Sequence, residues 1–565
     1  DTGVDGWSVG DFLEPAPIVQ DTAPPTAMIL VPLNGSTVSG TAVTVSASSS
    51  DNVGVVGVQF KLDGANLGAE DLSSPFSITW DTTLTANGSH ALTATARDAA
   101  GNSAISSVVT VVVSNTTSPP TGRVIEIYPS DANSTCNEEF ENVANTLQPG
   151  DTLILRGGIY TQTCRRAIIV NGTAASPITI KAASGENPIL TRPGNADYNY
   201  SNNNIEINGS YFTIQGLRFQ GGSAGVRFLG GNHITFVDNE VYETGNNAIS
   251  MNSANTDSFI IRRNHIHNTG LLSSTIGTTE GEGMYVGCNN AACIASNHLI
   301  ENNYIHHTRG TSEGGNDGIE VKTGSYNNII RNNVIHDTNI GTQFPCIFVY
   351  GGGAGLNTVE GNAMWNCGEA IQVASDAIIR NNLILNSSIN GITATPHSQV
   401  PTVKNVTIVN NTIYGHPNCL YIRWSGATNV TLANNAMYCP GNTAVNASGL
   451  TGNIKSNYVE GSLSGASIDN NGFFNGGAAS TAFTSPSALN FWPTTGSILR
   501  NTANATYVPS LDFNETVRTS PYDAGAYETG GLASNPGWTV GPGFKTTSST
   551  STTPTQSTQF AIGDR

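Results

Sequence analysis

Residues 316–336 read NDGIEVKTGSYNNIIRNNVIH, and both halves of this stretch recur between about residues 205 and 450. The first half contains Gly318–Val321, a four-residue apolar and polar alternation that we call a rung. Nine rungs start 21 to 35 residues apart. The second half closes on an Asn pair and returns as VDNEVY, RRNHIH, ENNYIH, RNNVIH, EGNAMW, RNNLIL, VNNTIY and ANNAMY. A repeat of this size predicts a stacked solenoid, with function on a surface built from many rungs.

The rungs predict which side chains form the core. Period-two alternation places the second and fourth residues of each rung on one face, and these positions are apolar in nearly every copy. The predicted core residues in the central rungs are Ile319, Val321, Ile347, Val349, Ile371 and Val373.

The second half predicts a ladder of amides. Stacked about 4.8 Å apart, identical Asn side chains can hydrogen-bond from coil to coil and so satisfy one another at a buried turn. The ladder residues are Asn239, Asn264, Asn303, Asn333, Asn362, Asn382, Asn411 and Asn435.

Together these patterns resemble the right-handed parallel β-helix of secreted polysaccharide lyases and related carbohydrate-active proteins. The resemblance covers about residues 122–530. GDTLILRGGIY and SPITIKAASGENPIL resemble the N-terminal coils of such proteins, and SLDFNETVRTSPYDAGAYE resembles a closing segment. The expected fold class is therefore all-β.

A separate module precedes the solenoid. Residues 22–114 carry short alternating runs divided by turn signals such as Asn34-Gly35 and Asn87-Gly88, which predicts a small β-sandwich. The segment resembles the bacterial immunoglobulin-like modules of secreted carbohydrate enzymes, which serve as spacers, adhesion units or stabilisers. The predicted divisions are an extension (1–21), the immunoglobulin-like β-sandwich (22–114), a linker (115–121), the β-helix (122–531) and a Ser/Thr-rich tail (532–565), which composition alone predicts to be disordered.

Composition predicts an extracellular protein, secreted or on the cell surface. Only 11% of the residues are charged, and the net charge of -18 offers no basic face, which argues against nucleic acid and anionic membranes as partners. No apolar stretch approaches the roughly 20 residues of a membrane span. No signal peptide stands at the N-terminus, so we expect a mature, exported product.

Eight cysteines support the same compartment. Two pairs join the start of one rung to the turn before the next, at separations of 21 and 20 residues, and would staple successive coils. A zinc site is disfavoured because no CxxC spacing occurs. The predicted disulfides are Cys136–Cys164, Cys288–Cys293, Cys346–Cys367 and Cys419–Cys439.

The outward positions of the rungs mix aromatic and polar side chains. Sugars favour such a surface, because their apolar faces stack on aromatic rings while their hydroxyls need a few placed polar groups. The alternative is an ordinary solvated sheet face. The predicted substrate-binding residues are Tyr285, Phe348, Gln372, Tyr421 and Arg423.

Acidic loops beside this face favour a functional site over an ordinary solvated surface. LLSSTIGTTEGEG and TRGTSEGGND deliver Glu280, Glu282, Glu313 and Asp317 beside Glu320 and Lys322. Crowded carboxylates repel unless a cation or proton lies among them, which predicts calcium on Glu282, Asp317 and Glu320. The string NDGIEVK resembles the acidic strand motif by which some β-helix lyases hold calcium. It departs from them in having Glu rather than Asp at 320, and in a lysine closer to that residue.

This chemistry suits β-elimination from a uronate. Calcium would neutralise the carboxylate, Lys322 would remove the C5 proton, and Tyr350 would donate to the leaving oxygen. The alternative for Lys322 is a plain ion pair with a neighbouring acid. A competing enzyme hypothesis is hydrolysis by paired carboxylates, Asp317 with Glu320 or Glu282.

Two further columns have structural interpretations. His267, His306 and His336 could bind a transition metal or act as acid and base, but aromatic residues continue their column, which favours ring stacking. Arg and Glu alternate in another column, which favours an ion-pair ladder.

The predicted function is binding and cleavage of a polysaccharide by calcium-assisted elimination. The rival hypothesis is a non-enzymatic adhesin or filament subunit that self-assembles through the immunoglobulin-like module and the termini.

Overall fold

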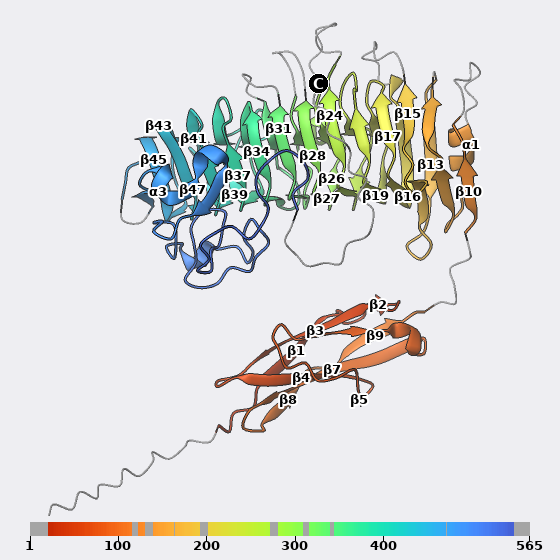
Figure 1. Ribbon diagram of the computed structural model, residues 1–565, viewed down its shortest axis with the longest axis horizontal. Coiled ribbons are helices and arrows are strands. Elements are labelled where there is room, and N and C mark those ends of the chain that lie inside the picture. Colours follow the sequence, from red (N-terminus) through yellow and green to blue (C-terminus); the bar gives the residue numbers. More distant parts are fainter. Residues whose placement is uncertain are drawn as a thin grey trace, which may run out of the picture. The chain divides into compact units, whose positions relative to one another are not determined.

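The computed structural model describes residues 21–115, 122–129, 139–162, 164–192, 202–271, 281–308, 316–338, 344–469 and 472–546. The chain divides into two compact units, Asp1–Pro119 and Pro120–Arg565 (Figure 1). Within the described ranges, no helix is long and apolar enough to cross a membrane.

The first unit is a β-sandwich, as predicted. A three-stranded antiparallel sheet consists of β1 (Thr26–Val31), β3 (Val43–Ser50) and β6 (Ser77–Trp80). The second sheet consists of β2 (Thr37–Val38), β9 (Val109–Val113), β7 (Gly88–Asp98), β4 (Val55–Leu62) and β5 (Ala65–Asn66), with β8 (Ser103–Ile105) paired to β7. Phe60 and Trp80 are buried in the core between them.

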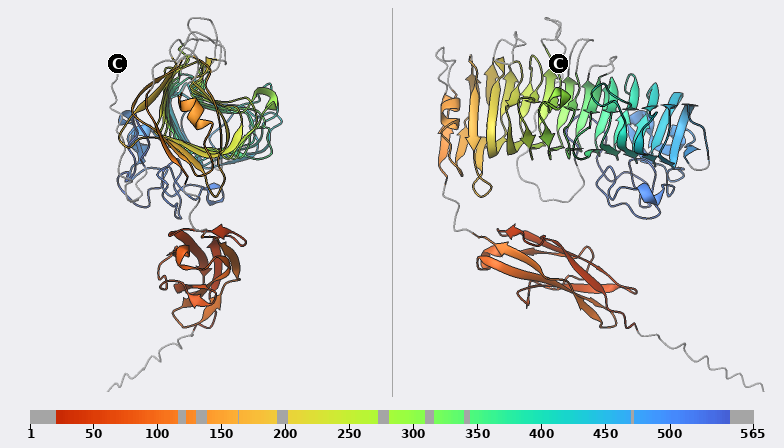
Figure 2. Two further views of the ribbon diagram at one scale, coloured as in Figure 1. Left: turned by 90° about the vertical axis from the view of Figure 1, so that its right-hand side faces the viewer. Right: turned by 180° about the vertical axis from the view of Figure 1, so that it is seen from behind.

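The second unit is the predicted parallel β-helix. Each coil contributes a strand to each of three parallel sheets, which we call sheets I, II and III (Figures 1 and 2). The strand β16 continues from sheet III into sheet I, while β43 and β45 pair within both sheet II and sheet III.

The strands of each sheet follow in chain order, as these bounds show. Sheet I consists of β10 (Val124–Ile127), β11 (Thr152–Leu155), β14 (Ile178–Ala182), β16 (Ile205–Gln215), β19 (Gly231–Val237), β23 (Ile260–Arg262), β27 (Leu299–Glu301), β30 (Ile329–Arg331), β33 (Asn357–Glu360), β36 (Ala377–Arg380), β39 (Lys404–Val409), β42 (Thr428–Ala433) and β44 (Asn453–Lys455), with β22 (Thr256–Asp257) and β26 (Ala295–Ser296) beside it. Sheet II consists of β12 (Gly158–Thr161), β15 (Pro188–Arg192), β17 (Arg218–Gly221), β20 (Glu240–Tyr242), β24 (His265–Thr269), β28 (Tyr304–Thr308), β31 (Val334–Thr338), β34 (Ala363–Cys367), β37 (Leu383–Leu385), β40 (Thr412–Tyr414), β43 (Ala436–Ser448), β45 (Asn457–Ser464) and β46 (Phe473–Asn475). Sheet III consists of β13 (Ala167–Asn171), β16, β18 (Val226–Phe228), β21 (Ile249–Met251), β25 (Met284–Val286), β29 (Ile319–Val321), β32 (Pro345–Val349), β35 (Glu369–Val373), β38 (Asn390–Ala394), β41 (Asn418–Arg423), β43 and β45.

The predicted core is confirmed. All six predicted inward residues of the central rungs are 0% exposed and belong to one apolar cluster that runs the length of the coils. At the N-terminal end, Phe140 and Ala144 of the short helix α1 (Glu139–Ala144) join this cluster. Seen along the coil axis, α1 lies within the outline of the sheets and closes the end of the core (Figure 2).

The asparagine ladder is also confirmed. Asn303 Nδ2 donates to Asn333 Oδ1 at 2.9 Å, and Asn333 Nδ2 donates to Asn362 Oδ1 at 3.0 Å. The same bond links each predicted member to the next and continues to Asn457. The residue before each ladder Asn has a positive φ, such as 55° at Asn332, which turns the chain sharply between sheets I and II.

Three of the four predicted disulfides lie within the described ranges and are formed: Cys288–Cys293, Cys346–Cys367 and Cys419–Cys439. Cys164 is disulfide-bonded, but its predicted partner Cys136 lies outside the described residues. The two coil-to-coil staples therefore join sheets II and III around the core.

A C-terminal segment covers the outer face of sheet II. It contains α3 (Ala479–Ala482), β47 (Phe483–Ser485) and β48 (Asn490–Pro493), and its apolar residues form a second cluster with Trp365 and Leu385 of the sheet. The packing continues to Lys545. Lys545 is 4% exposed and donates to Asn332 Oδ1 and to the backbone oxygens of Gly361 and Phe513. The disorder that composition predicts for the tail is wrong for residues 532–546. Contacts with these backbone acceptors and with the apolar face of sheet II order this part of the segment.

The histidine column forms a ring stack and the Arg/Glu column forms an ion-pair ladder, as the sequence favoured. His267 stacks on His306 and His306 stacks on His336, each with ring centroids 5.2 Å apart. On sheet I, Glu301 pairs with Arg262 and Arg331, and Glu360 pairs with Arg380.

Candidate active site

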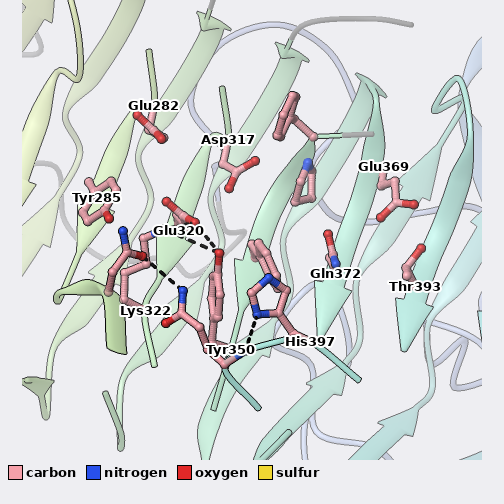
Figure 3. A pocket seen from close by; sticks show the side chains of 15 residues that line it. Glu282, Tyr285, Asp317, Glu320, Lys322, Tyr350, Glu369, Gln372, Thr393 and His397 are labelled. Atoms are coloured by element: carbon pink, nitrogen blue, oxygen red, sulfur yellow. Dashed lines mark hydrogen bonds and ion pairs between the residues drawn. The ribbon is translucent and has the colours of Figure 1, made fainter. Parts of the chain in front are cut away.

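A pocket of about 470 Å³ opens on the outer face of sheet III. The third residues of successive rungs stand side by side there, because Tyr285 pairs in register with Glu320, and Glu320 with Phe348. Gln372 and Thr393 continue the row on β35 and β38. The pocket is lined by Glu282, Tyr285, Asn289, Asp317, Glu320, Lys322, Phe344, Pro345, Phe348, Tyr350, Glu369, Gln372, Thr393, His397 and Gln399 (Figure 3).

Lys322 lies at the centre of a polar contact set. Its Nζ forms an ion pair with Glu320 Oε1 and lies 3.5 Å from Tyr350 Oη. The ammonium also faces the rings of Tyr285 and Tyr350, at 4.4 and 4.9 Å from their centroids. The Lys322 side chain is buried, so these contacts replace most of its water.

Tyr350 is held on both sides. Its hydroxyl donates to Glu320 Oε1 at 3.0 Å, and its ring stacks on Phe348 at 4.0 Å. The His397 ring stands edge-on at 4.6 Å. Burial, with the nearby charges of Glu320 and Asp317, raises the pKa of Tyr350 well above its usual range. The hydroxyl therefore stays protonated and can act as a donor.

Three predicted acids meet at the upper end of the pocket. Glu282, Asp317 and Glu320 lie at this end (Figure 3), and burial leaves each of them less than 5% exposed. Burial and the charges of Glu320 and Glu282 raise the pKa of Asp317 well above its usual range. Glu280 and Glu313, which were predicted to arrive on the loops, lie outside the described residues.

These acids offer the donor chemistry that calcium requires. Asp317 Oδ1 and Glu320 Oε2 are buried oxygens that accept no hydrogen bond from the described residues. A hard cation or a proton would satisfy such oxygens. Among the described residues, two sets of possible metal ligands have their ligand atoms within 4.8 Å of one another, and neither set contains these acids. The three acids are therefore spaced more widely than the ligands of a closed calcium cage.

Sequence reasoning missed Glu369, at the far end of the pocket. Its Oε1 accepts from Asn390 Nδ2 at 2.7 Å. Burial raises the pKa of Glu369 to about 7, although hydrogen bonds from Thr393 and Asn390 oppose the rise. A signal was present: Glu282, Asp317 and Glu369 each directly precede a rung, and this position forms its own column along sheet III.

The wall made by residues 395–403 was also missed. A bridge between His397 and Val400 shapes this loop, and His397 faces Phe348 and Tyr350. Gln399 fastens the wall to two earlier coils by accepting from Thr323 Oγ1, after β29, and from Asn290 N, after β25, both at 2.7 Å. Burial and the charge of Lys322 lower the pKa of His397, so this ring is neutral near pH 7.

Two predicted substrate-binding residues lie elsewhere. Tyr421 and Arg423 stand further along sheet III and do not line the pocket. The Arg423 guanidinium packs over the Tyr421 ring at 3.8 Å and donates to the backbone oxygens of Ile422 and Asn446. The pair therefore has a local structural role. The other eight predicted catalytic, metal and substrate-binding residues share one pocket.

Comparisons with known proteins agree with this architecture. The family described as Bacterial Ig domain matches residues 25–94, and the family described as Right handed beta helix region matches residues 288–437. The chain matches no curated protein. It combines a bacterial immunoglobulin-like domain with a right-handed parallel β-helix.

Several solved structures are similar in fold. Alginate lyase from Paenibacillus sp. str. FPU-7 is 22% identical, over 50% of this chain and 93% of that chain, with a TM-score of 0.40. Pectate lyase Pel9A is 15% identical, over 72% and 96%, with a TM-score of 0.46. The PL6 family alginate lyase AlyGC is 19% identical, over 62% and 53%, with a TM-score of 0.40. At these identities the likeness concerns the fold alone.

Proposed function

We propose that this protein is an extracellular enzyme that cleaves a uronate-containing polysaccharide by β-elimination in the pocket on sheet III. One observation carries the proposal: a lysine ammonium, a phenol hydroxyl and a carboxylate converge there, as Lys322 Nζ, Tyr350 Oη and Glu320 Oε1. Elimination needs a base for the C5 proton and an acid for the leaving oxygen. Tyr285 and Phe348 supply ring faces on which a sugar can stack.

Lys322 and Tyr350 take the two proton-transfer roles. Lys322 Nζ first passes its ammonium proton to solvent, and its lone pair then takes the proton from C5 as the bond between C4 and the leaving oxygen breaks. Tyr350 Oη, which its raised pKa keeps protonated until then, gives its proton to that oxygen as the oxygen gains negative charge. Glu320 orients both groups, because one of its oxygens contacts each of them. The products are a new reducing end and an unsaturated uronate.

Glu282, Asp317 and Glu320 would hold the proposed calcium ion. When bound, calcium neutralises the substrate carboxylate and so acidifies the C5 proton. Without a cation, three buried acids would repel a uronate, and Lys322 alone would have to offset them. We therefore expect cleavage to require calcium.

A panel of uronate polysaccharides tests the proposal, with ultraviolet absorbance of unsaturated products as the readout. The parent protein should produce this absorbance on at least one uronate, and a chelator should abolish it until calcium is restored. Products without the absorbance would contradict elimination. Unchanged rates in chelator would contradict the calcium role alone.

A hydrolase is the second candidate, favoured by Glu369. A carboxyl whose pKa lies at about 7 is suited to act as a general acid near neutral pH. Asp317, whose pKa burial also raises, is a further buried carboxyl in the same pocket. Under this mechanism, neutral glycans would be cut without new absorbance. Activity would decline above pH 7 as Glu369 loses its proton, and Glu369→Gln would be inactive.

A further inference from the structure

Sheet II carries a histidine cluster that the proposed reaction does not use. On β24, His265 and His267 point outward two residues apart, and His306 stands beside His267 on β28. His265 Nε2 lies 2.9 Å from His306 Nε2. One ring nitrogen from each of the three histidines lies within 4.8 Å of the other two.

Ring stacking accounts for only part of this arrangement. The stacked column runs through Tyr242, His267, His306, His336 and Trp365, which pair in register from coil to coil. His265 belongs to the neighbouring column, in register with Tyr304. Its ring nevertheless turns so that its Nε2 meets His306 Nε2. Stacking within a column does not require this contact between columns.

A buried carboxylate orients the rings. Glu240 Oε1 lies 3.1 Å from His267 Nε2 and 3.5 Å from His265 Nδ1. Arg218 Nε donates to the other carboxylate oxygen of Glu240, Oε2. A carboxylate paired with an arginine accepts hydrogen bonds, so Nδ1 of His265 faces an acceptor while its Nε2 faces His306.

This is the arrangement by which proteins prepare an imidazole for a metal. A carboxylate binds one ring N–H and leaves the other nitrogen as the ligand. Two nitrogens on one tetrahedral zinc ion, at about 2.0–2.1 Å each, lie about 3.4 Å apart. The observed 2.9 Å contact therefore needs only a small outward movement of the rings. The side chains of His265 and His267 are 13% and 15% exposed, so an ion can reach them.

We propose that His265, His267 and His306 form a binding site for a divalent transition-metal ion, with Glu240 as the carboxylate that orients the ligands. Imidazole nitrogens favour zinc, nickel and copper over calcium and magnesium, which prefer oxygen. The bound ion would join β24 to β28 and so tie two coils together outside the core. The site is separate from the proposed calcium site, because it uses sheet II and nitrogen ligands.

Untagged full-length protein, stripped with chelator, tests the site by calorimetric titration with zinc. We expect one equivalent to bind with a dissociation constant in the micromolar range or tighter, and the thermal midpoint to rise. His265→Gln and His306→Gln should each abolish this binding, and Glu240→Gln should weaken it roughly 10- to 100-fold. His336→Gln is the matched control and should leave binding unchanged, because Tyr304 and Asp337 already engage its two nitrogens.

A second measurement does not depend on variants that fold. Copper bound to the parent protein should show nitrogen hyperfine coupling in electron paramagnetic resonance, and excess calcium should not displace it. The proposal is overturned if zinc, nickel and copper all fail to bind, if copper shows oxygen ligands only, or if zinc binding survives in both His265→Gln and His306→Gln.

Discussion

Tyr350 on one coil donates a 3.0 Å hydrogen bond to Glu320 on the coil before it. The bond crosses between β32 and β29, so the candidate acid and the residue that orients it belong to different repeats. Lys322 joins them from the end of β29. The reactive set is therefore assembled by stacking, and each member can be tested while the coil itself remains.

Lys322→Ala should lower turnover on the preferred uronate roughly 100-fold or more, the usual contribution of a positioned base. The side chain lies outside the core, so the variant should keep the parent's circular dichroism spectrum and thermal midpoint within a few degrees. Arg423→Ala is the matched control on the same sheet and should keep full turnover. An unaltered rate in Lys322→Ala would place the base elsewhere.

Ile319→Ala should lower the free energy of unfolding by about 2–5 kcal/mol, because Ile319 is fully buried and its removal leaves a cavity. Urea unfolding measures the change. Ile169 is 61% exposed on β13, so Ile169→Ala should cost no more than about 0.5 kcal/mol. Equal effects of the two substitutions would contradict the inward position of Ile319.

Asn333→Ala should be destabilising although it removes no apolar surface. Asn303 donates to Asn333 through both its backbone N and its Nδ2, and Asn333 Nδ2 donates to Ile300 O. Each buried group left without its partner costs about 1–3 kcal/mol. The exposed residue Asn442 provides the control Asn442→Ala. The ladder would have no energetic role if both variants unfolded at the same urea concentration.

Stability should fall as the pH drops below 6.5, because two buried histidines remain neutral. Burial lowers the pKa of His298 to about 3 and that of His416 to about 4. The unfolded chain binds these protons below about pH 6.5 and the folded chain does not, so each histidine costs up to about 1.4 kcal/mol per pH unit. The raised pKa of Glu369 acts in the opposite direction between about pH 7 and 4.5.

The variant His416→Gln isolates this contribution. The parent and the variant share the effect of Glu369, so the difference between their stabilities reports His416 alone. Thermal midpoints measured from pH 7.5 to 5 should fall less steeply for the variant. Parallel curves would show that His416 titrates normally in the folded protein.

Peptides released without reduction should contain the pairs Cys288–Cys293, Cys346–Cys367 and Cys419–Cys439, and also Cys136–Cys164. Mass spectrometry identifies each pair directly. Replacing Cys346 and Cys367 together by serine should cost about 3 kcal/mol, as expected for a loop of this length. A Cys136 found with any other partner would contradict the predicted closure of the first coil.

The repeat made the architecture predictable from sequence. Alternation in rungs such as Gly318–Val321 gives the inward face, and the Asn at each turn gives the register, since both depend on local spacing. Once the register is known, Tyr285, Glu320, Phe348 and Gln372 necessarily stand in one row. Most of the candidate site follows from that row.

The remaining features depend on contacts that local spacing does not contain. His397 reaches the pocket on an irregular loop, and no period predicts which way that loop folds. The contact between His265 and His306 depends on the rotation of a side chain across two columns. Tyr421 stands in the row and Arg423 beside it, yet the pocket ends before them because its walls come from the coils of Glu282 and His397.

The cover on sheet II has a consequence for biosynthesis. Residues 479–545 leave the ribosome after every coil they protect, so Trp365, Leu385 and Tyr438 form an uncovered apolar face during translation. The coils can stack in order as they emerge, but the outer face of sheet II stays exposed to water until the last segment docks. A chain that ends before residue 479 would expose this apolar surface. Chaperones and proteases could therefore recognise unfinished copies by it.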